Sequence, residues 1–224
     1  MTTKSNLIIV FDLDDTLYNE IDFLESAFVE IAGFLSTKLN KSANQILTEM
    51  LSYYNNKQNA FKEVLAKNHL TDVDVEYLLK IYRNHLPNIS LTNQNKKLLE
   101  HLKGRVHKLG VITDGRSTQQ RNKIKALGLA DFFDDVIISE EFGSEKPNVA
   151  NYEYYTNKYG NGFNYVYIGD NTKKDFVAPN ALGWTSLCLL DNGKNIHAQN
   201  LNLNPDKTPT YTINNLTQIK DLLF

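Results

Sequence analysis

Short runs of apolar residues recur along the chain, and each ends abruptly at a polar or small side chain. The runs span residues 6–11, 106–113, 136–139, 165–169, 185–190 and 210–213. They alternate with segments of helical spacing, one of which begins at Ser117 with Gln120 three residues on, as in a capping box. This alternation predicts a doubly wound, mostly parallel, Rossmann-like α/β sheet. Functional groups in such folds gather at the carboxyl ends of the strands.

The interval between the first and second runs is far longer than the roughly 30 residues of a βαβ unit. Apolar residues at helical spacing fill the excess, and Ser42 with Gln45 marks a further helix start. We therefore expect a core made of residues 1–18 and 89–224 and an inserted helical cap made of residues 19–88. Both connections to the cap leave from the acidic strand end, which favours a lid over the site rather than a decorative insertion.

Three acids follow the first run directly: Asp12, Asp14 and Asp15. Like charges this close repel one another unless a cation or hydrogen bonds compensate them, so the cluster favours a divalent metal. An EF-hand does not fit, because Leu17 occupies the glycine position of such a loop and Phe23 its closing glutamate position. An acidic turn that merely ends the strand is the alternative.

A second pair of acids belongs to the fourth run. Asp170 follows its last residue, and Asp175 comes five residues later. In a parallel sheet Asp170 reaches the same edge as Asp12. Oxygen ligands of this kind suit Mg²⁺. Asp170 as an ordinary helix N-cap is the alternative.

Two anion-binding elements complete this edge. Thr113, Asp114 and Gly115 end the second run and open a helix, where backbone N–H groups and the hydroxyl suit a phosphate. Lys146, followed by Pro147 in the loop after the third run, supplies a compact positive charge for a phosphoryl oxygen. An ordinary turn and a solvated lysine would explain each element alone. Their order along successive strands favours one combined metal and phosphate site.

The residues at this edge resemble the four motifs of the haloacid dehalogenase-like (HAD) phosphohydrolases. The matching segments, in order, are FDLDDTLY, VITDG, the Lys146–Pro147 pair and IGDNTKKD. The insertion is similar to the helical cap that one HAD subclass carries between its first two motifs. The resemblance covers about residues 6–190, together with the C-terminal strand and helix.

The resemblance implies roles for the first two matched aspartates. Asp12 would be the nucleophile that forms an aspartyl-phosphate. Asp14 would protonate the leaving oxygen and later activate water, while its backbone carbonyl binds Mg²⁺. True dehalogenases lack an aspartate at this second position, so the chain looks like a phosphatase or a phosphomutase.

The resemblance also implies roles for the later motifs. Thr113 and Lys146 would hold the transferring phosphoryl group. Asp170 would be a direct metal ligand, and Asp175 would support it or hold a metal-bound water.

The sequence thus favours a Mg²⁺-dependent phosphatase acting on a small phosphomonoester, such as a sugar phosphate or a nucleotide. A phosphomutase on the same fold is the first alternative, and a non-enzymatic phospho-acceptor signalling domain is the second. Tyr18, Asn19, Phe23 and Arg116 lie near the inferred cleft and are the candidate substrate contacts.

The composition argues against several other classes. A formal net charge of −2 and a pI of about 6.2 do not suit a nucleic-acid surface. Cys188 is the only cysteine, which excludes an internal disulfide and a multi-cysteine metal site. No apolar run reaches the about 20 residues needed to span a bilayer, and the N-terminus does not look like a signal peptide. We therefore expect a cytoplasmic enzyme whose partner is a small phosphorylated metabolite, not nucleic acid or membrane.

Overall fold

Six parallel strands form one sheet in the computed structural model, which describes residues 4–224. The strands are β1 Ser5–Phe11, β2 Val106–Thr113, β3 Asp135–Ile138, β4 Asn164–Gly169, β5 Thr185–Leu189 and β6 Tyr211–Ile213. Their order in the sheet is β3-β2-β1-β4-β5-β6, which places the reversal of strand order between β1 and β4. The predicted doubly wound α/β fold is confirmed, and its ligand crevice is expected at this reversal.

Strand β1 lies in the middle of the sheet, between β2 and β4. Its side chains alternate between the two faces: Ile9 and Phe11 belong to one apolar cluster, Ile8 and Val10 to the other. Both clusters are buried, which explains why this strand is apolar at successive positions.

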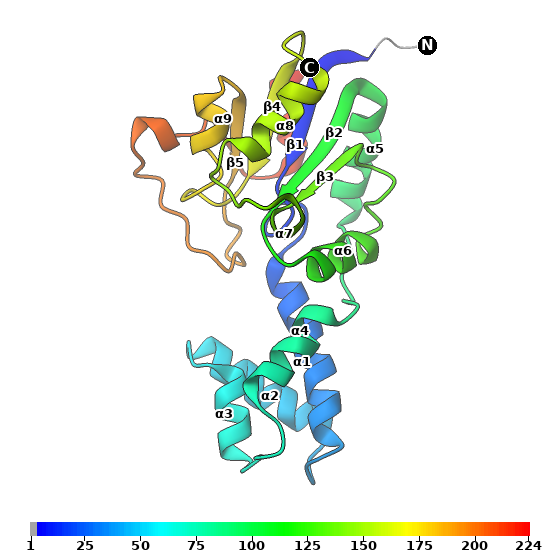
Figure 1. Ribbon diagram of the computed structural model, residues 1–224, viewed down its shortest axis with the longest axis vertical. Coiled ribbons are helices and arrows are strands. Elements are labelled where there is room, and N and C mark those ends of the chain that lie inside the picture. The colour runs from blue at the N-terminus through cyan, green and yellow to red at the C-terminus, as the bar shows by residue number, and fades with distance from the viewer. Residues whose placement is uncertain (1–3) are drawn as a thin grey trace.

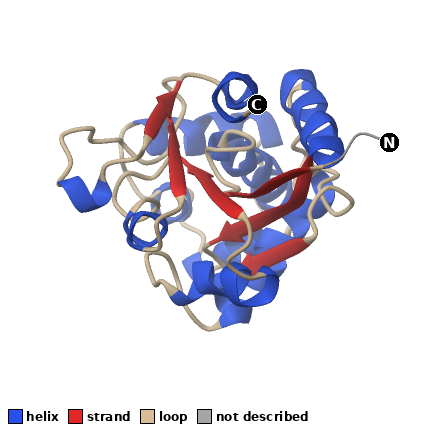
Figure 2. Cartoon of the chain, turned by 90° about the horizontal axis from the view of Figure 1, so that it is seen from above, coloured by secondary structure: helices blue, strands red, loops and turns tan. Residues whose placement is uncertain are grey.

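Helices cover both faces of the sheet (Figure 2). One face packs against α5 Asn93–Arg105, α6 Ser117–Ala126, η2 Leu216–Gln218 and α10 Ile219–Leu223. The other packs against α8 Ala150–Tyr159 and α9 Val177–Ala181. The remaining short elements are α7 Ser139–Phe142 and η1 Pro205–Lys207. Within residues 4–224, no helix has the length and apolar character needed to cross a membrane.

Four inserted helices extend from one end of the core (Figure 1). They are α1 Glu20–Ser36, α2 Ala43–Asn55, α3 Ala60–Lys67 and α4 Val75–Asn84. Their buried side chains, such as Phe28, Leu35, Met50 and Val64, form an apolar cluster of their own. The predicted helical insertion is confirmed, and we call these four helices the cap. Its division from the core at residues 19 and 88 stays a prediction.

The returning connection of the cap is attached to the core through α6. Asn122 Nδ2 donates hydrogen bonds to the carbonyl oxygens of Asn84, at 3.1 Å, and of His85, at 3.0 Å. The cap is therefore tied to the same helix that follows the carboxyl end of β2.

Candidate active site

The carboxyl ends of β1, β2 and β4 and the loop after β3 surround one polar cavity of about 100 Å³. Its lining residues are Asp12, Asp14, Asp15, Glu20, Thr113, Asp114, Lys146, Asp170, Asn171, Lys174 and His197. The structure therefore brings together the acids, the hydroxyl and the lysine that the sequence placed after successive strands.

A buried lysine joins two carboxylates at the base of this cavity. Lys146 Nζ lies 2.9 Å from Asp12 Oδ1 and 2.8 Å from Asp175 Oδ1, and it donates to the Tyr167 hydroxyl at 3.1 Å. Burial alone would lower the pKa of Lys146, but the two carboxylates outweigh it and hold the pKa well above its usual value. Lys146 is thus a fixed positive charge beside Asp12.

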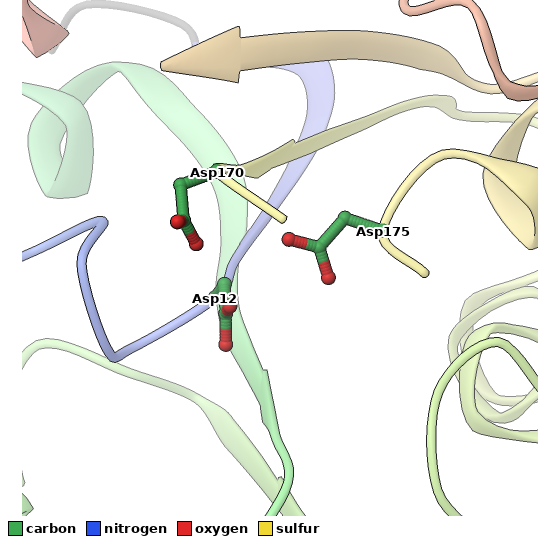
Figure 3. A group of neighbouring side chains, drawn as sticks. All are labelled: Asp12, Asp170 and Asp175. Carbon is green, nitrogen blue, oxygen red and sulfur yellow. The ribbon is translucent and has the colours of Figure 1, made fainter. Parts of the chain in front are cut away.

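Three carboxylates, those of Asp12, Asp170 and Asp175, lie close together beside the cavity, as Figure 3 shows. Asp12, Asp170 and Asp175 each offer one oxygen, and these oxygens lie within 4.8 Å of one another. Burial raises the pKa of Asp12 to about 7 and that of Asp170 to about 9, and neighbouring acids add to both shifts. One lysine compensates only part of this negative charge, so the donor set fits a divalent cation.

The oxygens that face such a cation can be identified from their partners. Both oxygens of Asp175 are used, one by Lys146 and the other by the N–H of Asn171 at 2.8 Å. By contrast, Asp12 Oδ2 and Asp170 Oδ1 have no hydrogen-bond partner among residues 4–224. Asp12 and Asp170 are therefore the candidate ligands, with Asp175 behind them.

The close packing behind the acids requires a glycine. A Cβ atom added at Gly169, the last residue of β4, would clash with the carboxyl group of Asp175. Any larger residue would displace Asp175 and, with it, the position of Lys146.

Asp14 is held by a separate set of partners. Its Oδ1 accepts hydrogen bonds from the Tyr18 hydroxyl at 2.5 Å and from Lys123 Nζ at 2.7 Å, and its Oδ2 accepts from Gln120 Nε2 at 2.9 Å. Burial alone would raise the pKa of Asp14, but Lys123 and these hydrogen bonds outweigh it and lower the pKa. Asp14 is therefore held as a carboxylate, the form that accepts a proton.

Two of these partners, Gln120 and Lys123, were not predicted as site residues. The Lys123 side chain is 1% exposed, and its ammonium lies 4.4 Å from the centre of the Phe23 ring. A signal for both was present, because their spacing with Ile124 places them on the buried face of α6. Polar side chains on a buried face require polar partners.

The start of α6 differs from the prediction for a related reason. Its N-cap is Arg116, without a side-chain cap, and the Ser117 hydroxyl donates to Glu141 Oε1 at 2.6 Å. The capping box predicted for Ser117 and Gln120 is wrong. The Gln120 side-chain amide instead donates a charge-assisted hydrogen bond to the carboxylate of Asp14, so it does not reach back to the start of the helix.

The turn after β2 holds the backbone of neighbouring segments in position. The Asp114 carboxylate accepts the main-chain N–H of Lys146 at 3.0 Å, and the Gly115 N–H donates to a serine hydroxyl of α7 at 2.9 Å. Thr113 is 1% exposed and lines the cavity. Thr113 and Lys146 therefore line the same cavity. Phosphate binding by Thr113, Lys146, Asp114 and Gly115 stays a prediction.

The loop after β5 forms another wall of the site, which nothing in the residue spacing indicated. Asn195 Nδ2 donates to Asp170 Oδ2 at 2.8 Å, and the Ile196 N–H donates to Asp15 Oδ2 at 2.8 Å. The other oxygen of Asp15 accepts the N–H of Glu20, the first residue of α1, at 2.7 Å. Asp15 therefore connects this loop to the start of the cap.

The four candidate substrate contacts lie around the cavity rather than in its lining. Phe23 is fully buried, and the Tyr18 hydroxyl is bonded to a carboxylate. Arg116 forms an ion pair with Glu140 at 2.7 Å, and Asn19 accepts a hydrogen bond from the loop after β5. Their contact with a substrate stays a prediction.

Comparison with known proteins identifies the family. The model of the family described as haloacid dehalogenase-like hydrolase matches residues 9–188. A glyceraldehyde 3-phosphate phosphatase of Methanocaldococcus jannaschii is 34% identical over 224 residues, which cover 96% of each chain. The pyrimidine 5'-nucleotidase YjjG of Escherichia coli is 30% identical over 128 residues, 56% of this chain and 53% of that one.

Solved structures show the same fold. The HAD-hydrolase YfnB of Bacillus subtilis, bound to magnesium, is similar with a TM-score of 0.66 at 21% identity, covering 96% of this chain and 97% of that one. The chain belongs to the haloacid dehalogenase-like hydrolases, and within them it is a phosphatase.

Proposed function

We propose that this phosphatase is Mg²⁺-dependent and hydrolyses a small phosphomonoester through an aspartyl-phosphate on Asp12. One observation carries the proposal: a single cavity joins the Asp12 carboxyl group, the Thr113 hydroxyl, the Lys146 ammonium and the Asp170 carboxyl group. These are a nucleophile, two groups for phosphoryl oxygens and a metal ligand.

The first candidate substrate is glyceraldehyde 3-phosphate. Two relatives that bear that name are 34% and 26% identical to this chain, and each alignment covers 96% of it. The size of the cavity supports a small substrate, since about 100 Å³ is well below the roughly 300–1,000 Å³ of pockets for larger ligands.

Asp12 is oriented for nucleophilic attack. Its Oδ1 is held by Lys146 at 2.9 Å and by the Leu13 N–H at 2.8 Å, which fixes the orientation of the carboxyl group in the cavity. A bond forms between a carboxylate oxygen of Asp12 and phosphorus while the ester bond to the leaving oxygen breaks. Thr113 and Lys146 stabilise the charge on the remaining phosphoryl oxygens.

Asp14 serves the proton transfers in this proposal. In its protonated form it gives a proton to the departing alkoxide and becomes a carboxylate. It then takes a proton from a water molecule, which restores the protonated form for the next turnover. That water attacks phosphorus, breaks the bond to Asp12 and releases inorganic phosphate. The carboxylate form that Lys123 maintains suits the second of these steps. General acid–base help of this kind contributes about 10²–10⁴-fold.

The metal ion would be held by the side chains of Asp12 and Asp170 and by the backbone carbonyl of Asp14. When bound, it would supply positive charge for the phosphoryl oxygens. Asp175 and Asn195 would then keep the ligands in place through their contacts with Lys146 and Asp170.

Release of inorganic phosphate tests the proposal directly. Wild type, Asp12→Asn and the surface control Asp221→Asn are incubated with Mg²⁺ and a panel of triose phosphates, other sugar phosphates and nucleoside monophosphates. We expect turnover by wild type and control, and a loss of about 10⁴-fold or more for Asp12→Asn, as for other nucleophiles. If wild type releases no phosphate from any ester, or if Asp12→Asn equals wild type, the proposal is wrong.

A further inference from the structure

The cap contributes one side chain to the lining of the catalytic cavity. Among the residues described as lining it, only Glu20 belongs to the cap, as the first residue of α1. Its backbone is fixed there, because the Glu20 N–H donates to Asp15 Oδ1 at 2.7 Å. Glu20 therefore lies opposite the groups assigned to phosphoryl transfer.

The carboxyl group of Glu20 lacks a hydrogen-bond partner within residues 4–224, although its side chain is only 20% exposed. Lys123 Nζ is 3.7 Å from Glu20 Oε1 but 2.7 Å from Asp14 Oδ1, so Asp14 is its main partner. Burial, with the Asp14 charge, raises the pKa of Glu20 to about 8. Largely buried polar groups are normally hydrogen-bonded, so this carboxyl group is prepared for a ligand.

The chemistry of the ligand follows from what a carboxyl group can bind. An ionised carboxyl group only accepts hydrogen bonds, whereas a protonated one also donates. A hydroxyl group satisfies both forms, since it is donor and acceptor. A second carboxylate on the substrate would meet the negative charges of Asp14 and Glu20 together, and Lys123, which lies near both, is already paired with Asp14.

We infer that Glu20 is a specificity-determining residue that hydrogen-bonds a hydroxyl group on the carbon chain of the leaving group. The inference rests on the proposed function. It narrows the substrate to a phosphate ester of a short polyol or hydroxyaldehyde, because the cavity of about 100 Å³ leaves little room beyond the phosphoryl group.

Paired esters that differ only in hydroxyl groups test this inference. Values of kcat/KM are measured for glycerol 3-phosphate and n-propyl phosphate with wild type, Glu20→Leu and Glu20→Gln. Glu25→Gln, on the exposed face of the same helix, is the control. We expect wild type to prefer glycerol 3-phosphate by about tenfold or more. Glu20→Leu should remove most of that preference while leaving n-propyl phosphate within about threefold.

The variants separate specificity from a structural role. Glu20→Gln keeps a donor and an acceptor, so it should retain part of the preference, and Glu25→Gln should retain all of it. Equal losses on both esters in Glu20→Leu would overturn the inference, as would a wild type without preference. If Glu20→Leu does not fold, the wild-type comparison of the two esters still tests the inference, because a wild type without preference contradicts it. If wild type hydrolyses neither ester nor any other phosphomonoester, the proposed function itself fails.

Discussion

Two buried lysines divide the site into two halves that are built differently. Lys146 lies between Asp12 and Asp175 at 2.9 and 2.8 Å, and all three belong to the core. Lys123 lies 2.7 Å from Asp14 but 3.7 Å from Glu20, which belongs to the cap. Both lysine side chains are 1% exposed. We name the two halves after the roles proposed for Asp12 and Asp14. The nucleophile half is complete within the core, whereas the acid–base half is shared with the cap.

The two lysines differ in how many carboxylates they pair with. This difference separates the groups proposed for the reaction from the group proposed for substrate recognition. Around Lys146 both carboxylates are at ion-pair distance. Around Lys123 only Asp14 is tightly paired, and Glu20 remains open to the cavity. A different cap residue at this position would change what is recognised without moving Asp12 or its lysine.

Among the substitutions that test this comparison, replacing Lys146 should have the largest effect on kcat and on stability. Lys146→Met removes the positive charge that contacts Asp12 and that we propose stabilises the transferring phosphoryl group. We expect kcat to fall by about 10²–10³-fold, the usual loss for one transition-state donor. Breaking a buried pair should also cost about 3–5 kcal/mol of the free energy of unfolding. Phosphate release and urea unfolding measure the two effects.

The exposed Lys173→Met is the matched control for Lys146→Met, because it removes the same charge from the loop after β4. It should keep wild-type kcat and stability. A Lys146→Met protein that is folded and retains more than about a tenth of wild-type kcat would contradict the role assigned to Lys146.

Replacing Lys123 should affect activity less, because it acts through Asp14. In Lys123→Met, Tyr18 and Gln120 still hold the Asp14 carboxylate, so we expect kcat to fall by only about tenfold. Stability should fall by about 1–3 kcal/mol, since the partner side chains are 18% and 20% exposed and keep some water. The same two assays apply.

The two lysine variants together test the division into halves. If Lys123→Met lowers kcat as much as Lys146→Met does, Lys123 contacts the reacting groups directly and the comparison is wrong. If Lys123→Met leaves kcat unchanged, Asp14 does not depend on its ammonium.

The sequence predicted the nucleophile half better than the acid–base half. Asp12, Lys146 and Asp170 each follow a buried apolar strand, and parallel strands bring such positions to one edge whatever their separation along the chain. The two acids were visible because they directly follow buried strands, whereas Lys146 lies beyond α7 in the loop after β3 and was identified only from its place in this order.

The acid–base half depends more on tertiary contacts. The spacing of Lys123 and Gln120 with Ile124 puts them on one face of α6, but it does not say that their partner is Asp14. Glu20 was hidden by its position at a helix start, where an acid is favourable in any case. Asn195 lies in an irregular loop, whose path has no periodic signal.

Replacing Asn195 has the smallest expected effect. It tests how the loop after β5 holds Asp170 in the nucleophile half. Its amide fixes Asp170 at 2.8 Å, and residues behind a metal ligand typically contribute 10–100-fold in metal affinity. Asp170 keeps its strand and its contact with the Gln199 amide through the backbone, so we expect Asn195→Ala to weaken Mg²⁺ binding by only about tenfold. The rise in melting temperature with Mg²⁺ concentration measures this affinity without any turnover. Asn192→Ala, in the same loop but bonded to Asn19, should bind Mg²⁺ as wild type does. An unchanged Mg²⁺ affinity in Asn195→Ala would mean that the core strands alone position Asp170, and that the loop after β5 only encloses the site.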